Sequence, residues 1–207
     1  YPLRGGIAHY IALLYRTLRK RGHTVSVLSF KRQYPSLLFP GKMQKDEGAE
    51  LIPVESHPVL DSINPVTWVQ ACFLLKKMKP DIVYFKYWMP FFAPCYAVLA
   101  FALRSFLRVP AVFLCDNVIP HEKKIADVWL TKLAFRFPDF FIVQSASVLS
   151  DLRTLRPNAR VRLVPHPVYE IFPPPVSKAE ARRRLGIRDA RVILFFGYIR
   201  RYKGLRY

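Results

Sequence analysis

Pro110 to Glu122 reads PAVFLCDNVIPHE, and the first six residues of this stretch are all apolar. A continuous apolar run is typical of a strand that lies in a parallel sheet and is covered on both faces. The run ends at Cys115, and a short polar connection follows it. Because ligands bind at the carboxyl ends of the strands in an open α/β sheet, we expect a functional site on this connection.

The connection carries four polar side chains of different chemistry. Asp116, Asn117, His121 and Glu122 supply a carboxylate, an amide, an imidazole and a second carboxylate. Such a set can bind a polar substrate. The alternative is that Asp116 and Asn117 only form a turn, and that His121 and Glu122 only begin the next helix. The residues by themselves leave both interpretations open.

On either side of this unit, strand patterns and helix patterns alternate. Strands are predicted near residues 23–30, 49–54, 81–85, 110–115, 139–143, 161–164 and 192–196. Helices are predicted near residues 7–21, 65–78, 94–107, 123–137, 147–155 and 178–185. The helix at 123–137 is expected to have Trp129, Leu133 and Phe137 on one face. The alternation predicts an α/β fold in which a parallel sheet forms a Rossmann-like domain.

A glycine pair, Gly5 and Gly6, precedes the first predicted helix. Glycines at the start of a helix let the backbone approach a ligand closely, at the positive end of the helix dipole. A plain tight turn is the alternative. A Rossmann unit also needs a strand in front of such a loop, so we expect the first strand to be missing from this chain.

A basic loop follows the last predicted strand, in the stretch RVILFFGYIRRYKGL at residues 191–205. Gly197 permits a sharp turn, and Arg200 and Lys203 then occur with the spacing Gly-x-x-Arg-x-x-Lys-Gly. A guanidinium can bind two phosphate oxygens and an ammonium adds a point charge, so this loop can bind a diphosphate. The alternative is a solvated basic turn.

The composition excludes a disordered chain and points to an anionic partner. The 207 residues are 52% hydrophobic, and 33 Lys and Arg against 14 Asp and Glu give a net charge of +19. Nucleotides, anionic lipids and nucleic acids all fit that charge. Nucleic acid is the least favoured, because the basic residues are scattered and no helix-turn-helix, zinc-ligand or RNP signature is present.

The three cysteines, Cys72, Cys95 and Cys115, lie in apolar segments without the spacing of metal ligands. We therefore expect reduced core residues in a cytoplasmic protein, and no metal or cofactor. No signal peptide is recognised at the start of the sequence. The longest apolar stretch, Phe91 to Leu103, is shorter than the ~20 residues that span a bilayer, so we expect a buried helix there.

Three stretches together resemble the group 1 glycosyltransferases of family 4, which have the GT-B fold of two Rossmann-like domains. FGYIRRYKGL resembles the beginning of their second domain, DNVIPHE resembles their HNVxPHE loop, and PLRGGIAHY resembles their first loop. The resemblance implies an N-terminal, acceptor-side domain at residues 1–168. Residues 169–207 would be the interdomain crossing and the beginning of a truncated C-terminal, nucleotide-sugar-binding domain.

The resemblance also implies a reaction, in which a sugar moves from a nucleotide diphosphate sugar to an acceptor hydroxyl, with retention and without a metal. Arg200 and Lys203 would bind the donor diphosphate. Gly5, Gly6, Asn117 and Glu122 would bind substrate, and the catalytic positions would be Asp116 and His121. The 207-residue chain by itself is expected to be inactive, because the family's Glu-x7-Glu pair for the donor sugar would lie beyond it.

Asp116 departs from the family pattern, since many relatives have histidine there. A carboxylate only accepts hydrogen bonds and is repelled by phosphate, so Asp116 is expected to face a sugar hydroxyl or a neighbouring cation. We favour a role in acceptor binding, with His121 as a supporting contact.

The expected partners are a nucleotide diphosphate sugar and a glycan or lipid-linked acceptor. Basic clusters at residues 16–21 and 76–79 add an anionic membrane surface, so the protein is expected on the inner face of the cell membrane, in glycan or glycolipid biosynthesis. The alternatives are a basic nucleic-acid-binding protein, or a sugar-nucleotide epimerase or noncatalytic relative on the same fold.

Overall fold

The computed structural model of the chain describes residues 5–35, 52–119, 125–169, 173–187, 191–195 and 204. The chain divides into two compact units, Tyr1–Pro167 and Val168–Tyr207. The boundary expected from the sequence lay between residues 168 and 169.

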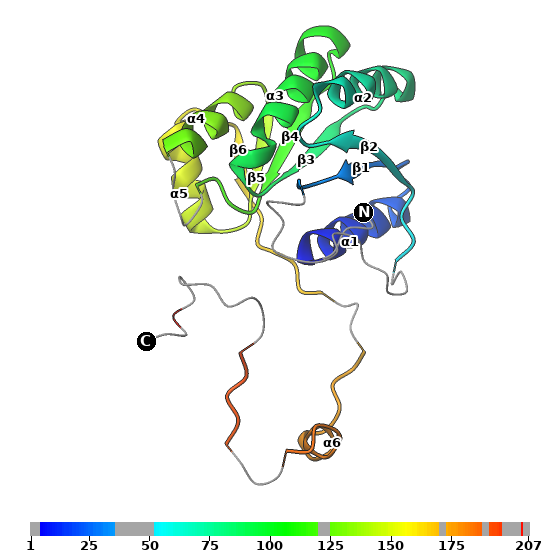
Figure 1. Ribbon diagram of the computed structural model, residues 1–207, viewed down its shortest axis with the longest axis vertical. Coiled ribbons are helices and arrows are strands. Elements are labelled where there is room, and N and C mark those ends of the chain that lie inside the picture. The colour runs from blue at the N-terminus through cyan, green and yellow to red at the C-terminus, as the bar shows by residue number, and fades with distance from the viewer. Residues whose placement is uncertain are drawn as a thin grey trace. The chain divides into compact units, whose positions relative to one another are not determined.

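The first unit alternates helices and strands. In chain order it contains α1 (Gly6–Lys20), β1 (Val27–Arg32), β2 (Ser56–Asp61), α2 (Pro65–Met78), β3 (Val83–Tyr87), the 3-10 turn η2 (Pro90–Phe92), α3 (Ala93–Ala102), the π-helical turn η3 (Leu103–Leu107), β4 (Ala111–Cys115), α4 (Ile125–Ala134), β5 (Phe140–Val143), α5 (Ala146–Leu155) and β6 (Val161–Leu163). Every described strand pair is parallel: β1 pairs with β2, and a second sheet has the order β3-β4-β5-β6. Figure 1 shows α1 on one side of these strands and α2 and α3 on the other. The predicted α/β fold with a parallel sheet is confirmed.

The helices begin where the sequence supplies a cap. The side chain of Asn64 accepts a hydrogen bond from the backbone N–H of Val66 at the start of α2, and Pro65 occupies the first turn, where its missing N–H costs nothing. Ser145 caps α5 in the same way, by accepting from the N–H of Val148. These caps explain why the predicted starts of both helices agree with the structure.

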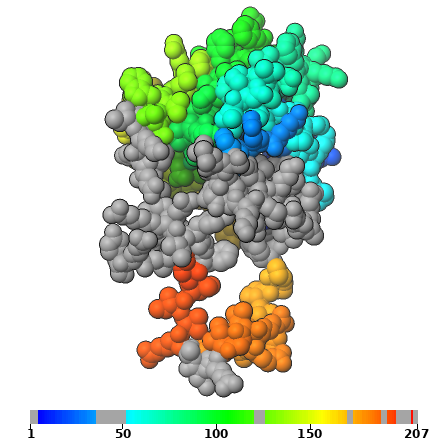
Figure 2. Space-filling view, viewed as in Figure 1, coloured from blue at the N-terminus to red at the C-terminus, as the bar shows by residue number. Residues whose placement is uncertain are grey.

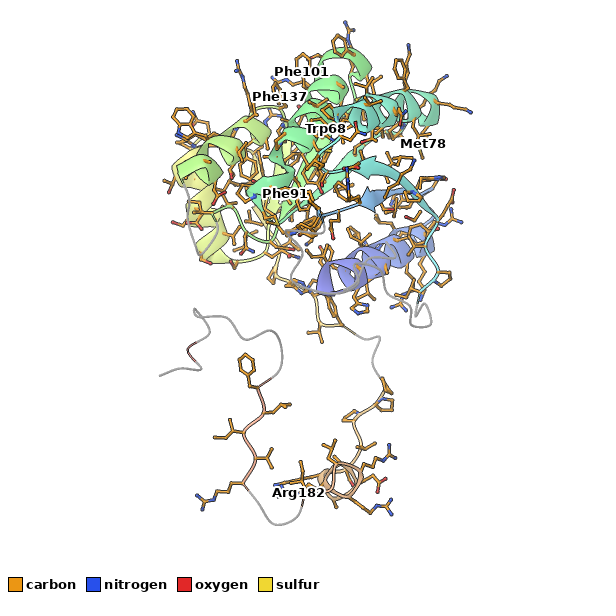
Figure 3. All side chains as sticks on the ribbon, in the orientation of Figure 1. Trp68, Met78, Phe91, Phe101, Phe137 and Arg182 are labelled. Atoms are coloured by element: carbon orange, nitrogen blue, oxygen red, sulfur yellow. The ribbon has the colours of Figure 1, made fainter. Side chains whose placement is uncertain are left out.

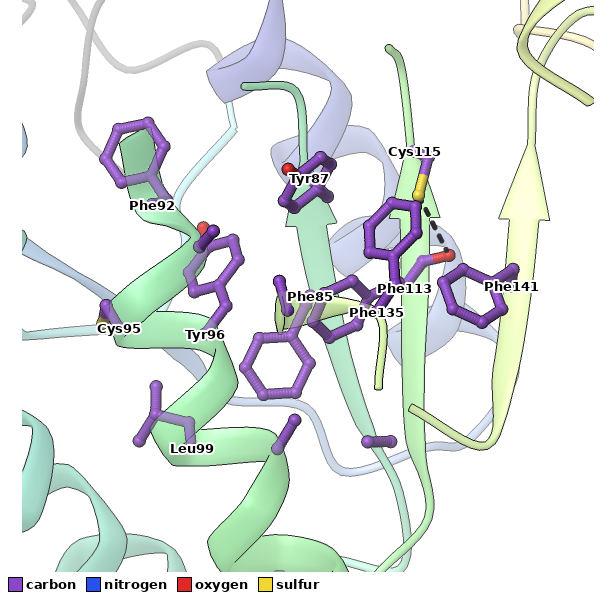
Figure 4. Packing of buried hydrophobic residues seen from close by; sticks show 14 of the residues in the cluster. Phe85, Tyr87, Phe92, Cys95, Tyr96, Leu99, Phe113, Cys115, Phe135 and Phe141 are labelled. Carbon is purple, nitrogen blue, oxygen red and sulfur yellow. Dashed lines mark hydrogen bonds between the residues drawn. The ribbon is translucent and has the colours of Figure 1, made fainter. Parts of the chain in front are cut away.

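Aromatic rings fill the core between the second sheet and its helices. Phe85, Tyr87, Phe113, Phe135 and Phe141 are all buried, and Figure 4 shows them packed together. The ring centroids of Phe85 and Phe113 are 4.9 Å apart, as are those of Tyr87 and Phe135. Each such pair adds about 0.5–1.5 kcal/mol beyond the area that it buries. The core therefore fixes the second sheet and the carboxyl ends of its strands.

Helix α3 belongs to this core. Seven of its ten residues are buried, among them Cys95, Tyr96 and Leu99. In the described part of the chain, the continuous helical segment Pro90–Leu107 is the one segment that is long and apolar enough to cross a membrane, and 56% of it is buried inside the protein. Packing of this kind is that of a core helix, as the sequence predicted.

Two predicted elements of the first unit are wrong in position. The strand predicted at 49–54 is instead β2, and the described residues 52–55 are not in a strand. Pro53 cannot donate to a ladder, whereas Pro58 is tolerated in β2 because the β1–β2 register shifts next to its partner, between Ser29 and Phe30. The chain accepts that irregularity because β2 buries Leu60 in the core.

The face predicted for α4 is also wrong. The helix ends at Ala134, before Phe137, while Trp129 and Leu133 are exposed. The buried face carries Thr131 and Ala134 instead, because a hydroxyl with two hydrogen-bond partners packs against the sheet as readily as an apolar side chain.

The second unit contains α6 (Lys178–Arg184), which begins where the sequence predicted and is capped by Ser177, whose side chain accepts from the N–H of Glu180. The strand predicted at 192–196 is not found over the described residues 191–195, and Ile193 is 99% exposed. A strand needs a ladder partner, and no strand is present among the residues of this unit that the structure describes. Phe196 lies outside those residues.

Candidate functional site

The carboxyl ends of three strands meet at one edge of the second sheet. Tyr87 pairs with Cys115, and Cys115 pairs with Val143, so β3, β4 and β5 end side by side. Asp116 and Gln144 are the first residues after β4 and β5. The expectation that the Asp116 connection follows a strand's carboxyl end is met.

Alternation of side chains places three polar groups on the same side of this edge. Phe85 and Tyr87 point into the aromatic core, so Lys86 between them points to the opposite face, where α1 lies. By the same alternation, Asp116 and Gln144 follow core residues and point to the side of Lys86. Backbone periodicity therefore brings together a lysine, a carboxylate and an amide from three neighbouring strands.

Lys86 is the centre of this cluster. Its ammonium forms an ion pair with Asp116 Oδ1, lies 3.5 Å from Gln144 Oε1, and lies 3.8 Å from the centroid of the Tyr10 ring in α1. The side chain is only 6% exposed. A carboxylate, an amide oxygen and an aromatic face thus replace the water that a lysine normally has around it.

Burial and the ion pair act on Lys86 in opposite directions. Burial lowers the pKa of Lys86, because it disfavours the charged form, and the neighbouring Asp116 carboxylate opposes that change. Removal of one partner of a buried ion pair typically costs about 3–5 kcal/mol, because the other charge is left uncompensated. Asp116 therefore stabilises the charged form of Lys86.

Asp116 is anchored on one side and open on the other. Its backbone N–H donates to Tyr87 O at 2.9 Å, which fixes the residue to the end of β3. Its side chain is 24% exposed, and no partner of Oδ2 is found in the described part of the chain. The sequence predicted that this carboxylate faces a sugar hydroxyl or a neighbouring cation, and in the structure the ammonium of Lys86 lies beside it. Asn117 is half-buried next to it.

Gly5 and Gly6 begin the helix that carries Tyr10. Gly5 has φ +115°, in the region that favours glycine, and its carbonyl accepts the N–H of Ala8 at 3.0 Å. A Cβ at either glycine would meet no atom of the described chain within 4 Å, so both positions face open space. The glycine pair thus starts the helix that closes the lysine cluster from the α1 side.

His166 joins the same neighbourhood through Tyr10. The two ring centroids are 5.3 Å apart, and Nδ1 of His166 lies 3.0 Å from Pro167 O. Four predicted site residues, His121, Glu122, Arg200 and Lys203, lie outside the described residues. Sequence reasoning missed Lys86, Gln144 and Tyr10, although a lysine near the end of a buried strand is an unusual enough position to have drawn notice.

Among the described residues, no three His, Cys, Asp or Glu side chains are grouped so that they could hold a metal ion. The cysteines are free thiols, and Cys95 and Cys115 are buried. Burial raises the pKa of Cys95 to about 12, which makes its thiol unreactive near neutral pH.

Helices that alternate with the strands of parallel sheets define a domain of the Rossmann-like class. The model of the family described as Glycosyltransferase Family 4 matches residues 4–170, which include every helix and strand of the first unit. The chain belongs to this family, so it is a glycosyltransferase domain of the GT-B type, and its substrates are a sugar donor and an acceptor. No curated protein matches the chain.

Proposed function

We propose that the protein transfers a sugar from a nucleotide diphosphate sugar to a hydroxyl of a glycan or lipid-linked acceptor, with retention and without a metal, in glycan or glycolipid biosynthesis. The observation that carries this proposal is the Asp116 carboxylate. It is held by a buried ammonium at the carboxyl edge of the sheet, in a domain that belongs to a glycosyltransferase family.

Asp116 binds the acceptor in this proposal. A charged carboxylate with one oxygen open to solvent accepts a hydrogen bond from a sugar hydroxyl, and it repels the phosphates of the donor. Asn117 and Glu122 extend the polar contacts along the same loop, with His121 in support. Gly5 and Gly6 leave room for substrate against the backbone at the start of α1.

Arg200 and Lys203 bind the donor diphosphate. The bond between the sugar carbon and the phosphate oxygen breaks, its electron pair stays on the diphosphate, and the two cations neutralise the charge that develops there. The acceptor oxygen forms its bond to the sugar carbon on the same face, and the departing phosphate takes the proton of the acceptor hydroxyl. This sequence needs no protein nucleophile.

The test uses the full-length protein and a panel of UDP- and GDP-sugars, with the donor saturating and the acceptor varied. Asp116→Asn is expected to raise the acceptor KM or to lower the rate about tenfold, because a charged hydrogen bond is lost. Affinity for UDP or GDP, measured by calorimetry, should fall in Arg200→Ala and Lys203→Ala and stay unchanged in Asp116→Asn.

Asp81→Asn, an exposed aspartate in front of β3, is the matched control and should behave like the wild type. Wild-type kinetics in both Asp116→Asn and His121→Ala would show that the loop is only a turn. Unchanged diphosphate affinity in both Arg200→Ala and Lys203→Ala would return the basic loop to a solvated turn.

We further propose a cytoplasmic protein held at the inner face of the cell membrane. At the end of α2, Lys76, Lys77 and Lys79 are exposed. The same helix also exposes apolar side chains, since Val66 is 62% and Phe73 is 68% exposed. Lysines beside exposed apolar side chains fit the surface of an anionic bilayer, where each cation contributes about 1 kcal/mol.

The neighbouring helical segment also exposes apolar side chains. Phe101 in α3 and Phe106 in η3 are both exposed, with ring centroids 5.6 Å apart. Figure 2 shows the α2 and α3 regions adjoining at the surface of the first unit, and Figure 3 labels Phe101 and, at the end of α2, Met78. Exposed aromatic rings on adjoining helices support contact with lipid rather than with water alone.

A further inference from the structure

Lys86 is the one charged residue that is buried among the residues that the structure describes. Stability does not explain why a lysine stands there, because well-packed apolar residues in place of a buried ion pair are often neutral or stabilising. The position itself does offer an explanation, since Lys86 lies beside the carboxylate that the proposed function assigns to the acceptor.

The ammonium is enclosed by groups of the protein itself. It pairs with the carboxylate of Asp116, lies 3.5 Å from the amide oxygen of Gln144 and lies 3.8 Å from the centroid of the Tyr10 ring. Only 6% of the side chain is exposed, so a substrate cannot reach it without displacing one of these groups. Lys86 therefore acts through its neighbours rather than on the reacting atoms.

We infer that Lys86 is a positioning residue for acceptor binding, which holds Oδ1 of Asp116 so that the carboxylate presents Oδ2 to the acceptor hydroxyl. This inference rests on the proposed function. Gln144, directly after β5, holds the ammonium and Tyr10 of α1 covers it, so groups from two further elements support the pair. Among the residues that the structure describes, the thiol of Cys115 also lies next to the pair, and it is neutral because burial raises its pKa.

Loss of the Lys86 ammonium removes the group that holds Oδ1 of Asp116. In Lys86→Met the carboxylate has lost the partner of Oδ1 and turns toward water. This change disturbs the acceptor contact and leaves the donor site intact. The defect should therefore appear in the acceptor KM and not in the affinity for nucleoside diphosphate.

The experiment is a double-mutant cycle in the full-length protein with Lys86→Met, Asp116→Asn and the two combined. Lys86→Met is expected to raise the acceptor KM about tenfold or more, as the loss of a charged contact predicts. In the Asp116→Asn background it should have no further effect, because the residue through which it acts has already changed. Lys86→Arg, which keeps the charge, should restore part of the acceptor affinity.

Lys132→Met is the matched control, since Lys132 is an exposed lysine beside an aromatic ring, that of Trp129. It should leave the acceptor KM and the diphosphate affinity unchanged. Urea unfolding of all the variants is measured alongside, and the double variant is expected to lose less stability than the two single variants together.

The inference is overturned if Lys86→Met leaves the acceptor KM unchanged, or raises it by the same factor in both backgrounds. If Asp116→Asn shows wild-type kinetics, or no sugar of the panel is transferred, the proposed function fails instead. In that case the unfolding cycle still decides whether Lys86 and Asp116 act as a pair, and independent losses of stability would overturn the pairing.

Discussion

The hydrogen bond between Tyr87 and Thr131 offers a test of how the end of β3 is held. The Tyr87 and Thr131 hydroxyl oxygens are 2.9 Å apart, and both residues are buried. The Thr131 hydroxyl also donates to Asp127 O at 2.8 Å. Because a hydroxyl has a single proton, Tyr87 must be the donor toward Thr131. Burial raises the pKa of Tyr87 well above its ordinary value, so this donor stays protonated.

The assignment of the donor predicts unequal costs for the two substitutions. Tyr87→Phe removes the donor and leaves Thr131 with its bond to Asp127, so the loss should be about 1 kcal/mol. Thr131→Val leaves the Tyr87 hydroxyl buried without an acceptor, and that should cost about 1–3 kcal/mol. The double variant removes both groups, and its loss should be smaller than the sum by about 0.5–1.5 kcal/mol.

Urea unfolding followed by circular dichroism measures all three losses. Tyr84→Phe is the matched control in the same strand, because Tyr84 is exposed, and it should stay within about 0.5 kcal/mol of the wild type. A Tyr87→Phe loss larger than the Thr131→Val loss would refute the donor assignment. Strictly additive losses would refute the bond itself.

Two further predictions concern pH and lipid. Burial raises the pKa of Cys95 from 9.0 to about 12 and also raises the pKa of Cys115. The contribution of the two neutral thiols to stability is therefore complete below pH 9.0 and is lost as the pH rises toward 12. The free energy of unfolding in urea should be lower at about pH 11 than at about pH 8, and equal values would contradict this prediction. Phe73→Ser and Lys76→Glu should each weaken cosedimentation of the protein with anionic vesicles. Arg162→Glu, a charge-matched control on the edge strand β6, should not weaken it. If the wild-type protein binds anionic vesicles no more strongly than neutral ones at low salt, the membrane proposal is refuted.

The elements that the sequence predicted well are those with a local physical cause. The apolar run of β4 has no competing structure, and Asn64, Ser145 and Ser177 each satisfy an N–H at a helix start. The position of β2 had no such local cause. It depends on pairing with β1 and on burial of Leu60, and both are tertiary contacts.

The exposed stretch at residues 192–195 also shows that a strand depends on tertiary contacts. Its apolar pattern predicts a buried strand, but a pattern gives only the preference of a segment and cannot supply its neighbours. Without a paired strand in the described part of the second unit, Ile193 and Leu194 stay exposed despite the pattern.

The sequence predicted Asp116 at the candidate site but not Lys86, and the reason is geometric. Asp116 follows a strand that was placed correctly, whereas the strand predicted at 81–85 stopped one residue before Lys86, which left the lysine in a surface connection. In the structure β3 continues to Tyr87, and its last residue is in register with Cys115. A strand's penultimate residue and the first residue after its parallel neighbour then point to the same face, because side chains alternate. A lysine and an aspartate at those two positions must meet, so the register of two strands, rather than either segment alone, determines this ion pair.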